Sequence, residues 1–536
     1  MIMFTLILFV MMIMLGGLAV DLMRYESIRT SLQQTSDRSV LAATALSQNL
    51  DREAVVEDYF AREGLSDYLL DVSSDEGLNF ANVSLTAQAN VTPFFMHMLG
   101  INEMAAPAAS SAEQRITNVE IAMVLDVSRS MVLTPSRIVN LKSAAREFVR
   151  EVRRTDTENR ISISLVPYNG QVNLGQPLRE KFNETDVHGV ANVNCLDLPT
   201  SIFNTVGISR TQAFAMTPHV DAYSSTSTSN SYLTYTNSSS ALPNTLNRWC
   251  PPQGNNIVRV HQNNVATLES QIEGLTAIGA TSIDLGMKWG ATLLDPSSRG
   301  IVSEMAGAGQ VPAEFAGRPL EYDDPEAMKV IVLMSDGQNF NETRINDGYR
   351  TGDTMTIYRG NTDDNYSIFH ASRVGTGTSG ICNSRPFWVA HLSAWHSRPW
   401  NGSTPSSSAC YSTTATYTGV VRQTWQQLWS SVRVSWVAWQ LYGRPLGSSF
   451  YTTWMNNFRS QVDSTAMDDR LRVLCDAVKG RGVIVFGIAF EATSHGIDTV
   501  RGCSTSSSHF FDADGLEITT AFRAIASQIS SLRLTQ

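Results

Sequence analysis

An apolar run that ends in three alternating oxygen-bearing side chains constrains the fold of this chain most strongly. Residues 119–125 are mostly apolar, as in a strand that is buried inside a sheet. Asp126, Ser128 and Ser130 follow, and their alternation lets one tight loop turn all three oxygens towards a single point. Hard divalent cations such as Mg²⁺ prefer carboxylate, hydroxyl and water oxygens. The D-x-S-x-S spacing after a buried strand therefore predicts a metal site at the edge of a sheet.

Two later segments offer ligands of the same kind. Residues 279–286 form a small-residue turn that opens a helical stretch, and Thr281 would present a hydroxyl there. Residues 330–337 form a second apolar strand that ends in Asp336 and a glycine. An Asp-Gly pair after a strand is usually only a turn, but all three segments in chain order are hard to obtain by chance. Thr276 is a competing hydroxyl; we prefer Thr281 because it follows the Gly-Ala turn and starts the helix.

Together, these three segments resemble the metal-ion-dependent adhesion site of the von Willebrand factor A domain family. The family pattern is D-x-S-x-S, then a G-G-T-like turn, then a strand that ends in D-G; the second glycine of the turn is alanine in this chain. The resemblance implies that Ser128, Ser130 and Thr281 approach a Mg²⁺ or Mn²⁺ ion most directly. It also implies that Asp126 and Asp336 bind the ion directly or through water.

Residues 1–20 are almost wholly apolar and uncharged. A run of this length can cross a bilayer as a helix. A cleaved signal peptide is the alternative, but its apolar region would be shorter and would normally follow Lys or Arg. We therefore predict a membrane anchor, although the positive-inside rule would place Arg24 and Arg29 in the cytosol. A true start upstream of Met1 would explain why no basic residue precedes the run.

The helix is expected to continue beyond the anchor. No Gly or Pro occurs between Gly17 and Gly64, and a weak helical stripe of small and apolar residues runs through the segment. An unbroken helix over residues 18–62 would be about 65 Å long. The patterns G-x-A-V-D and R-x-x-L-Q within residues 16–43 resemble the N-terminus of TadG-like proteins, membrane-anchored assembly proteins of the tight-adherence (Tad) pilus, and residues 529–535 look like the family's ending. This resemblance implies pilus-assembly components as partners.

Composition and cysteine content are typical of an exported protein. With 40 Lys+Arg against 50 Asp+Glu, the net charge is −10, which argues against nucleic acid as a partner. Six cysteines in a chain with a membrane segment predict disulfides in an oxidising compartment. The sequence contains no C-x-x-C pair, the motif that would indicate zinc or thiol-redox chemistry. We expect an inner-membrane anchor with the bulk of the chain in the periplasm. Nearest neighbours are expected to pair: Cys195 with Cys250, Cys382 with Cys410, and Cys475 with Cys503.

Four parts are expected along the chain: the anchor at 1–20, a helical extension at 21–64, a small β stalk at 65–116 and an A-type domain at 117–536. Alternation at 82–91 predicts a strand, and the Ala/Ser-rich run at 105–112 a return strand. In the A-type part, short apolar strands alternate with helices, which predicts an α/β fold with a doubly wound, mostly parallel sheet. Strands are expected at 119–126, 161–168, 328–335, 482–490 and 507–512, and helices at 136–154, 264–273, 282–294, 467–479 and 516–532.

Two insertions are expected in this domain. The first, at about 175–263, is rich in Ser, Thr and Asn over 223–240, as in a partly disordered loop. The second, at about 341–465, holds eight tryptophans: Trp388, Trp395, Trp400, Trp425, Trp429, Trp436, Trp439 and Trp454. Exposed, they would form a surface for a partner or a glycan; buried, they are the core of the insertion, which is the interpretation we favour.

We expect a binding protein rather than an enzyme. The sequence has no H-E-x-x-H, no G-x-S-x-G and no P-loop motif, and its nine histidines are scattered. The expected function is ion-bridged recognition, in which an acidic side chain of a protein partner fills an open position on the metal. The alternative is a surface adhesin that binds host or matrix glycan through the Trp-rich insertion. A hydrolase with its active site in that insertion is the least favoured class.

Overall fold

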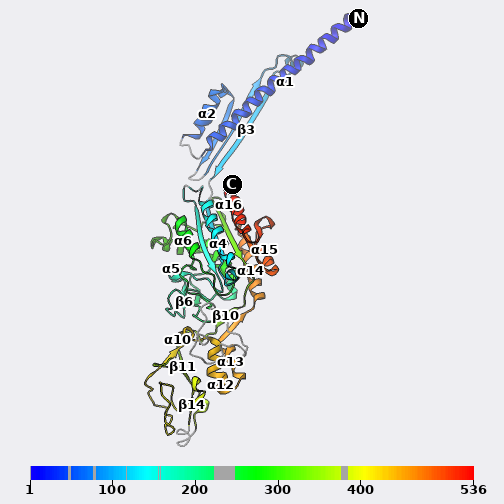
Figure 1. Cartoon of the computed structure of the whole chain (residues 1–536). Helices are drawn as coiled ribbons and strands as arrows, with labels where there is room; N and C mark the ends of the chain where they lie inside the picture. The colour runs from blue at the N-terminus through cyan, green and yellow to red at the C-terminus, as the bar shows by residue number, and fades with distance from the viewer. Residues whose placement is uncertain are drawn as a thin grey trace. The chain divides into compact units, whose positions relative to one another are not determined.

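The computed structural model (Figure 1) describes residues 2–45, 50–76, 80–115, 118–154, 156, 158–221, 248–375 and 384–535. The chain separates into two compact units. Met1–Asn118 with Ser530–Gln536 forms one, called here the N-terminal unit, and Val119–Ile529 forms the other, called the sheet unit.

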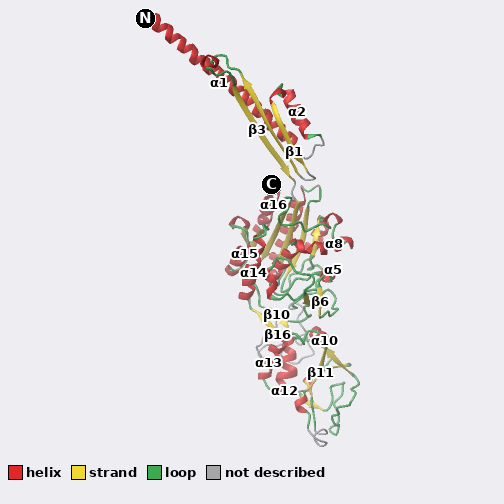
Figure 2. Ribbon diagram, turned by 180° about the vertical axis from the view of Figure 1, so that it is seen from behind, coloured by secondary structure: helices red, strands yellow, loops and turns green. Residues whose placement is uncertain are grey.

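The N-terminal unit combines two helices with a three-stranded antiparallel sheet in the order β1-β2-β3 (Figure 2). Its elements are α1 (Ile2–Ala43), α2 (Arg52–Arg62), the 3₁₀ turn η1 (Ser66–Tyr68), β1 (Leu69–Glu76), β2 (Phe80–Val91), η2 (Met96–Leu99) and β3 (Met104–Arg115). Strands β2 and β3 coincide with the alternating run at 82–91 and the Ala/Ser-rich run at 105–112. Strand β1 had no clear alternation in the sequence.

Helix α1 has two different halves. Its large apolar side chains from Ile2 to Leu15 are exposed, and among the described helices α1 alone is long and apolar enough to cross a membrane, a property shared by signal sequences. Towards its end, Leu32 and Val40 are buried in a core with Val83 and other residues of the sheet. The small residues of this half let the helix lie close to the strands.

The continuous helix predicted over residues 18–62 is wrong, because α1 ends at Ala43 and α2 begins at Arg52. The Asp51 side chain caps α2 by accepting the backbone N–H of Ala54 at 2.9 Å. Turning back places Val56 and Phe60 of α2 in the same core as Leu32. An unbroken helix would carry these two apolar side chains away from the sheet, so burial outweighs the helical continuity that the lack of Gly and Pro indicated.

The sheet unit is built on a six-stranded sheet in the order β18-β17-β9-β4-β5-β8. The pairs β4/β5, β9/β17 and β17/β18 are parallel, and β8 runs antiparallel to β5 at one edge. The strands are β4 (Asn118–Asp126), β5 (Ile161–Tyr168), β8 (Arg259–Gln262), β9 (Ala327–Ser335), β17 (Ile484–Phe490) and β18 (Phe510–Ala513). Strand β8 lies inside the insertion predicted at 175–263, so that insertion ends before β8; four residues were too few to show strand alternation.

The central strands are covered on both faces. Ala122 and Val124 of β4 share a core with helix α7, while Ile121 and Met123, which point the other way, are equally buried. The expected helices are α4 (Pro135–Arg154), α6 (Val265–Gly274), α7 (Ile283–Leu294), α14 (Ser464–Lys479) and α16 (Glu517–Thr535). Two further helices, α8 (Arg299–Gly307) and α15 (Ser494–Cys503), had not been predicted.

Short elements fill the described part of the first insertion: α5 (Gly175–Arg179), β6 (Asn183–Thr185), η3 (Thr200–Asn204) and β7 (Ala213–Ala215). Strands β6 and β7 pair in parallel. The Ser/Thr/Asn-rich run at 223–240, for which a disordered loop was expected, lies outside the described residues.

The second insertion has a sheet and a core of its own. Its antiparallel sheet has the order β14-β13-β12-β11-β15, and β10 pairs with β16 between this sheet and the six-stranded sheet (Figure 2). The strands are β10 (Glu342–Ile345), β11 (Asp353–Gly360), β12 (Tyr366–Phe369), β13 (Phe387–Val389), β14 (Ala394–His396), β15 (Val420–Thr424) and β16 (Arg459–Val462). The helices are α10 (Trp425–Ser431), α11 (Val434–Trp436), the π-helix η10 (Val437–Gly443), α12 (Arg444–Leu446) and α13 (Ser449–Phe458).

Packing explains the tryptophans of this insertion. Trp388, Trp425, Trp429 and Trp436 are buried in one cluster, and the other four of the eight, all within the described range 384–535, are half-buried. Trp425 and Trp429 stack at 5.3 Å between ring centroids. The interpretation of these rings as the core of the insertion therefore agrees with their burial.

Two of the three expected disulfides join described residues: Cys195–Cys250 and Cys475–Cys503. Cys503 is the last residue of helix α15. Cys410 is also disulfide-bonded, and its expected partner, Cys382, lies outside the described residues.

Candidate functional site

The predicted carboxylates lie where two neighbouring strands end. Asp126 is the last residue of β4, and Asp336 directly follows β9, the next strand in the sheet. The segment after Asp126 turns at once into the short helix α3 (Ser130–Leu133). Ligands of open α/β sheets bind beyond the carboxyl ends of the strands, which is this edge.

Four of the five predicted residues are joined by a chain of hydrogen bonds. The Ser128 backbone N–H donates to Asp126 Oδ1 at 2.8 Å. The hydroxyls of Ser128 and Ser130 are hydrogen-bonded at 2.8 Å, and Ser130 Oγ donates to Asp336 Oδ1 at 2.7 Å. Residues 206 positions apart in the sequence thus meet at one cluster of oxygens.

Thr281 is held beside this cluster through its backbone. Two backbone hydrogen bonds join the preceding loop to the Asp126–Ser130 turn. The Ile278 N–H donates to the Val127 carbonyl at 2.8 Å, and the Arg129 N–H donates to the Gly279 carbonyl at 3.1 Å. Gly279 has φ +82°, a conformation that favours glycine. The carbonyl of Thr281 accepts the N–H of residue 340 at 2.8 Å, which ties the loop to the segment after Asp336. The competing Thr276 is exposed in the preceding loop.

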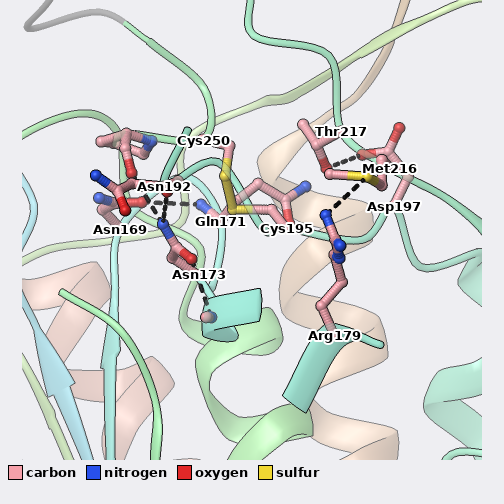
Figure 3. The surroundings of a disulfide bond; sticks show 12 residues. Asn169, Gln171, Asn173, Arg179, Asn192, Cys195, Asp197, Met216, Thr217 and Cys250 are labelled. Carbon is pink, nitrogen blue, oxygen red and sulfur yellow. Dashed lines mark hydrogen bonds between the residues drawn. A yellow bond between two sulfur atoms is a disulfide. The ribbon is translucent and has the colours of Figure 1, made fainter. Parts of the chain in front are cut away.

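The loop after β5 supports the same turn from the other side. The Asn169 carbonyl accepts the Ser282 N–H at 2.8 Å, and Ser282 Oγ donates to the carbonyl of Gly170 at 3.0 Å. Figure 3 shows Asn169 close to the Cys195–Cys250 disulfide, which joins two segments of the first insertion.

Two residues missed by the sequence analysis contact Asp126. Ser335 Oγ donates to Asp126 Oδ2 at 2.8 Å, and the Tyr168 hydroxyl lies 3.4 Å from the same oxygen while donating to the Met334 carbonyl at 3.0 Å. Ser335 immediately precedes the D-G pair, so its position at the end of the strand was a usable signal. Tyr168 ends β5, the other neighbour of β4, and its place at the same edge follows only from the strand order.

A third missed contact is an arginine from α4. Arg137 Nη1 lies 3.2 Å from Asp336 Oδ2, and its Nε donates to Glu491 Oε2 at 2.7 Å. Arg137 and Glu491 are 354 positions apart and carry no motif, so no sequence signal pointed to them. The arginine offsets part of the negative charge that surrounds Asp336.

Burial makes the carboxylates of the site unusually basic. Desolvation, with the nearby charge of Asp336, raises the pKa of Asp126 from 3.8 to about 7, against the opposing hydrogen bonds from Ser128 and Ser335. Desolvation also raises the pKa of Asp336, although Ser130 and Arg137 oppose that shift. The cluster holds three carboxylates, with that of Glu491, but one guanidinium, which contacts Asp336 and Glu491 only, so it has room for further positive charge.

The donor set is suited to a hard cation. Its side chains supply carboxylate and hydroxyl oxygens, which Mg²⁺ and Mn²⁺ accept, whereas structural zinc sites are built from Cys and His. Within the described ranges of the chain, no three His, Cys, Asp or Glu side chains converge as a metal-binding group. A metal at this edge would thus depend on the hydroxyls of Ser128, Ser130 and Thr281 in addition to the two aspartates.

A comparison with family models finds a match at the N-terminus. Residues 1–46 match the model of the family described as putative Flp pilus-assembly TadE/G-like. The match covers the segment whose motifs resembled TadG-like proteins in the sequence analysis. No curated protein matched the chain.

Solved structures with some likeness come from pili. The von Willebrand factor domain of the type V pili tip protein Mfa5 from Porphyromonas gingivalis shares 13% identity, with a TM-score of 0.31, over 78% of this chain and 97% of that one. The pilus adhesin SpaC from Lactobacillus rhamnosus GG shares 11% identity, with a TM-score of 0.30, over 86% of this chain and 34% of that one. The pilus adhesin RrgA from Streptococcus pneumoniae shares 12% identity, with a TM-score of 0.28, over 87% of this chain and 50% of that one. Scores of this size do not identify a shared fold.

Proposed function

We propose that this chain is a membrane-anchored envelope protein of Tad (Flp-type) pilus assembly or surface adhesion that binds a protein partner through a divalent metal ion. Two observations support the proposal. The TadE/G-like match lies on the apolar N-terminal segment. In the sheet unit, the bond between Ser130 and Asp336 joins two strand ends beside a second buried carboxylate, and this contact carries the metal-binding part of the proposal.

The sheet unit is proposed to be a doubly wound von Willebrand factor A-type domain with a metal-ion-dependent adhesion site. Ser128, Ser130 and Thr281 would hold the ion through their hydroxyls, and Asp126 and Asp336 would do so directly or through water. A bound Mg²⁺ or Mn²⁺ supplies a positive charge with one coordination position open to a partner. Because the three hydroxyls are neutral, they leave that charge only partly offset, which favours capture of an acidic side chain from the partner.

The proposed location follows from the anchor. Residues 1–20 would span the bacterial inner membrane, and the bulk of the chain would lie in the periplasm or cell envelope, where disulfides form. Other pilus-assembly components are the proposed source of the acidic side chain. No catalytic role and no nucleic-acid partner are proposed. The alternative of glycan binding through the Trp-rich insertion receives no support from the burial of its tryptophans, none of which is exposed.

The test is a titration of the full chain in detergent micelles with Mn²⁺, followed by electron paramagnetic resonance and by calorimetry. Asp126→Ala and the double variant Ser128→Ala, Ser130→Ala should each lose binding by about a hundredfold or more, since each removes ligands of the ion. Thr281→Ala should weaken binding, whereas Thr276→Ala, the exposed hydroxyl nearby, is the matched control and should leave it unchanged. Equal binding by all of these proteins would refute the metal site.

A further inference from the structure

The connection between β2 and β3 is an exposed apolar loop. Between Pro93 and Asn102 its only titratable side chain is His97. Phe94 is 64% exposed, Met98 67% and Leu99 56%. Large apolar side chains this exposed and this close together mark a binding surface on a soluble or membrane-bound protein.

A carboxylate of α1 fixes the position of this loop along the helix axis. Asp21 is buried, and it accepts the backbone N–H groups of three successive loop residues: Phe94 at 2.8 Å, Phe95 at 2.7 Å and Met96 at 2.8 Å. These N–H groups open the turn η2, so the carboxylate satisfies donors that would otherwise have no partner. The loop therefore cannot slide along α1 without losing three hydrogen bonds to a charged group.

One helical turn away, Gly17 admits an aromatic ring from the loop. A Cβ atom at residue 17 would overlap Cγ of the Phe95 ring, so only glycine leaves room for this ring. At Gly16, by contrast, an added Cβ would meet nothing within 4 Å. Gly17 and Asp21 both belong to the Gly-rich, V-D-ending pattern at the start of the TadG-like segment, and the loop contacts give both a structural reason.

The loop faces the apolar half of α1. A cavity of about 300 Å³ lies between them, and all of its lining is apolar: Val10, Ile13, Met14, Leu18, Phe95, Met98 and Leu99. The charged residues begin only at Asp21, and the next, Arg24, lies over the Phe94 ring at 4.0 Å. Cationic and aromatic side chains of this kind gather at the boundary between lipid and water.

We propose that residues 94–101 insert into the bilayer beside α1, so that the N-terminal unit is seated on the membrane through a helix and a loop. The occupant of the apolar surface is lipid of the membrane that α1 spans, because the exposed loop residues lie against the exposed apolar surface of Ile2–Leu15, and His97 is the only titratable side chain among them. The level of Asp21 and Arg24 then marks the lipid–water boundary. This proposal rests on the anchor of the proposed function.

The experiment uses the full chain in vesicles of phosphatidylethanolamine and phosphatidylglycerol, with one added cysteine carrying an environment-sensitive fluorophore. Met98→Cys is the test position. Met12→Cys, on the exposed apolar half of α1, reports the anchor, and Leu70→Cys, 66% exposed on β1 of the same unit, is the aqueous control. Fluorophores at residues 98 and 12 should both show a blue shift and lose quenching by iodide, whereas the one at 70 should remain quenched.

The outcomes separate this proposal from the anchor on which it rests. Quenching at residue 98 with protection at 12 would refute loop insertion and leave the anchor intact. Quenching at both positions would refute the anchor as well. Protection at 98 that grows with protein density and accompanies cross-links between two copies would also overturn the proposal, in favour of a contact between chains.

A pair of glycine variants tests the mechanism that places the loop. Gly17→Ala should restore iodide quenching at residue 98, because its Cβ displaces the Phe95 ring. Gly16→Ala is the matched control, since it adds the same methyl group one residue away in open space, and it should leave residue 98 protected. Equal protection in both variants would show that the Gly17 contact does not position the loop.

Discussion

Two buried carboxylates, one in each unit, differ in their hydrogen-bond donors and in the charges beside them. Asp21 of the N-terminal unit is 1% exposed and accepts three backbone N–H groups at 2.7–2.8 Å. Asp126 of the sheet unit is fully buried, accepts one backbone N–H from Ser128 and the hydroxyl of Ser335, and shares its site with a second carboxylate, Asp336. The first carboxylate is saturated by backbone donors, whereas the second accepts from Ser128 and Ser335 but lies beside another carboxylate.

This difference separates a structural carboxylate from a candidate binding one. A saturated carboxylate such as Asp21 holds two segments together and needs no ligand. A pair of buried carboxylates among neutral hydroxyls still has uncompensated negative charge, and carboxylates whose pKa values are raised in this way are candidates for a functional site. The units differ in cross-linking too, because all six cysteines fall within Val119–Ile529 and none in the N-terminal unit.

The largest effect expected from this difference is on stability against pH. Asp126 has a pKa of about 7 when folded, against an ordinary pKa of 3.8, so the folded state binds more protons than the unfolded state between these values. In chelator, the free energy of unfolding of the sheet unit should therefore fall as the pH rises from about 4 to about 7, by on the order of 4 kcal/mol, and then level off. Denaturant titrations followed by tryptophan fluorescence report this unit alone, because all ten tryptophans lie in it.

Asp126→Asn provides the control for the pH dependence. The variant should lose most of the slope, with a smaller remainder from Asp336, whose pKa is also raised by burial. Saturating Mg²⁺ should reduce the slope in the wild type, because the ion binds the ionised carboxylate. An unchanged slope in Asp126→Asn would show that the pH dependence of the free energy of unfolding does not come from Asp126.

Reduction of the disulfides is expected to act on one unit only. Removing the Cys475–Cys503 bond, which closes a loop with a sequence separation of 28, should cost the sheet unit about 3 kcal/mol. A double variant of these two cysteines to serine, compared with the wild type in thermal unfolding, measures the cost. Proteolysis within the N-terminal unit should be unchanged.

Thiol labelling of the denatured, unreduced chain should find no free cysteine; labelling of all six would contradict an oxidising compartment.

The sequence predicted the elements whose signals are local. The D-x-S-x-S spacing and the two strand-ending aspartates lie within short segments, and the structure brings Asp126, Ser128, Ser130 and Asp336 together. Alternation located β2, and the helices expected at 136–154 and 282–294 correspond to α4 and α7. Whether a metal binds at these residues is decided by neither observation and stays a prediction.

What the sequence could not predict depended on tertiary contacts. The break between α1 and α2 follows from burial of Val56 and Phe60 against the sheet, and the only local signal for it was the capping side chain of Asp51. Arg137 reaches Asp336 from a helix, with no motif to mark it. Helix α15 contains two glycines, which weaken the local preference for helix although its N-terminal residues are well capped by Thr493.

A smaller effect is expected when the saturated carboxylate loses its charge. Asp21→Ala leaves three backbone N–H groups of the loop without an acceptor, so exchange of the amide hydrogens of Phe94, Phe95 and Met96 should accelerate on the order of tenfold or more. Hydrogen exchange of the full chain in detergent, read by mass spectrometry over peptides of residues 90–101, checks this. The pH dependence of the sheet unit should be the same as in the wild type. Unchanged exchange in these peptides would mean that Asp21 does not hold the loop.

The smallest effect concerns the arginine that partly completes the acidic cluster. Arg137 contributes positive charge 3.2 Å from Asp336 Oδ2 and so competes electrostatically with a metal ion for that carboxylate. Arg137→Gln should therefore tighten Mn²⁺ binding by a factor of about five, which corresponds to about 1 kcal/mol for a partly exposed pair. Arg146→Gln, which removes an arginine of the same helix whose partner is the exposed Glu273, is the matched control and should bind Mn²⁺ as the wild type does. Weaker binding in Arg137→Gln alone would instead mean that the arginine orients Asp336 for the ion, and the cluster would then count the guanidinium among its supports rather than its competitors.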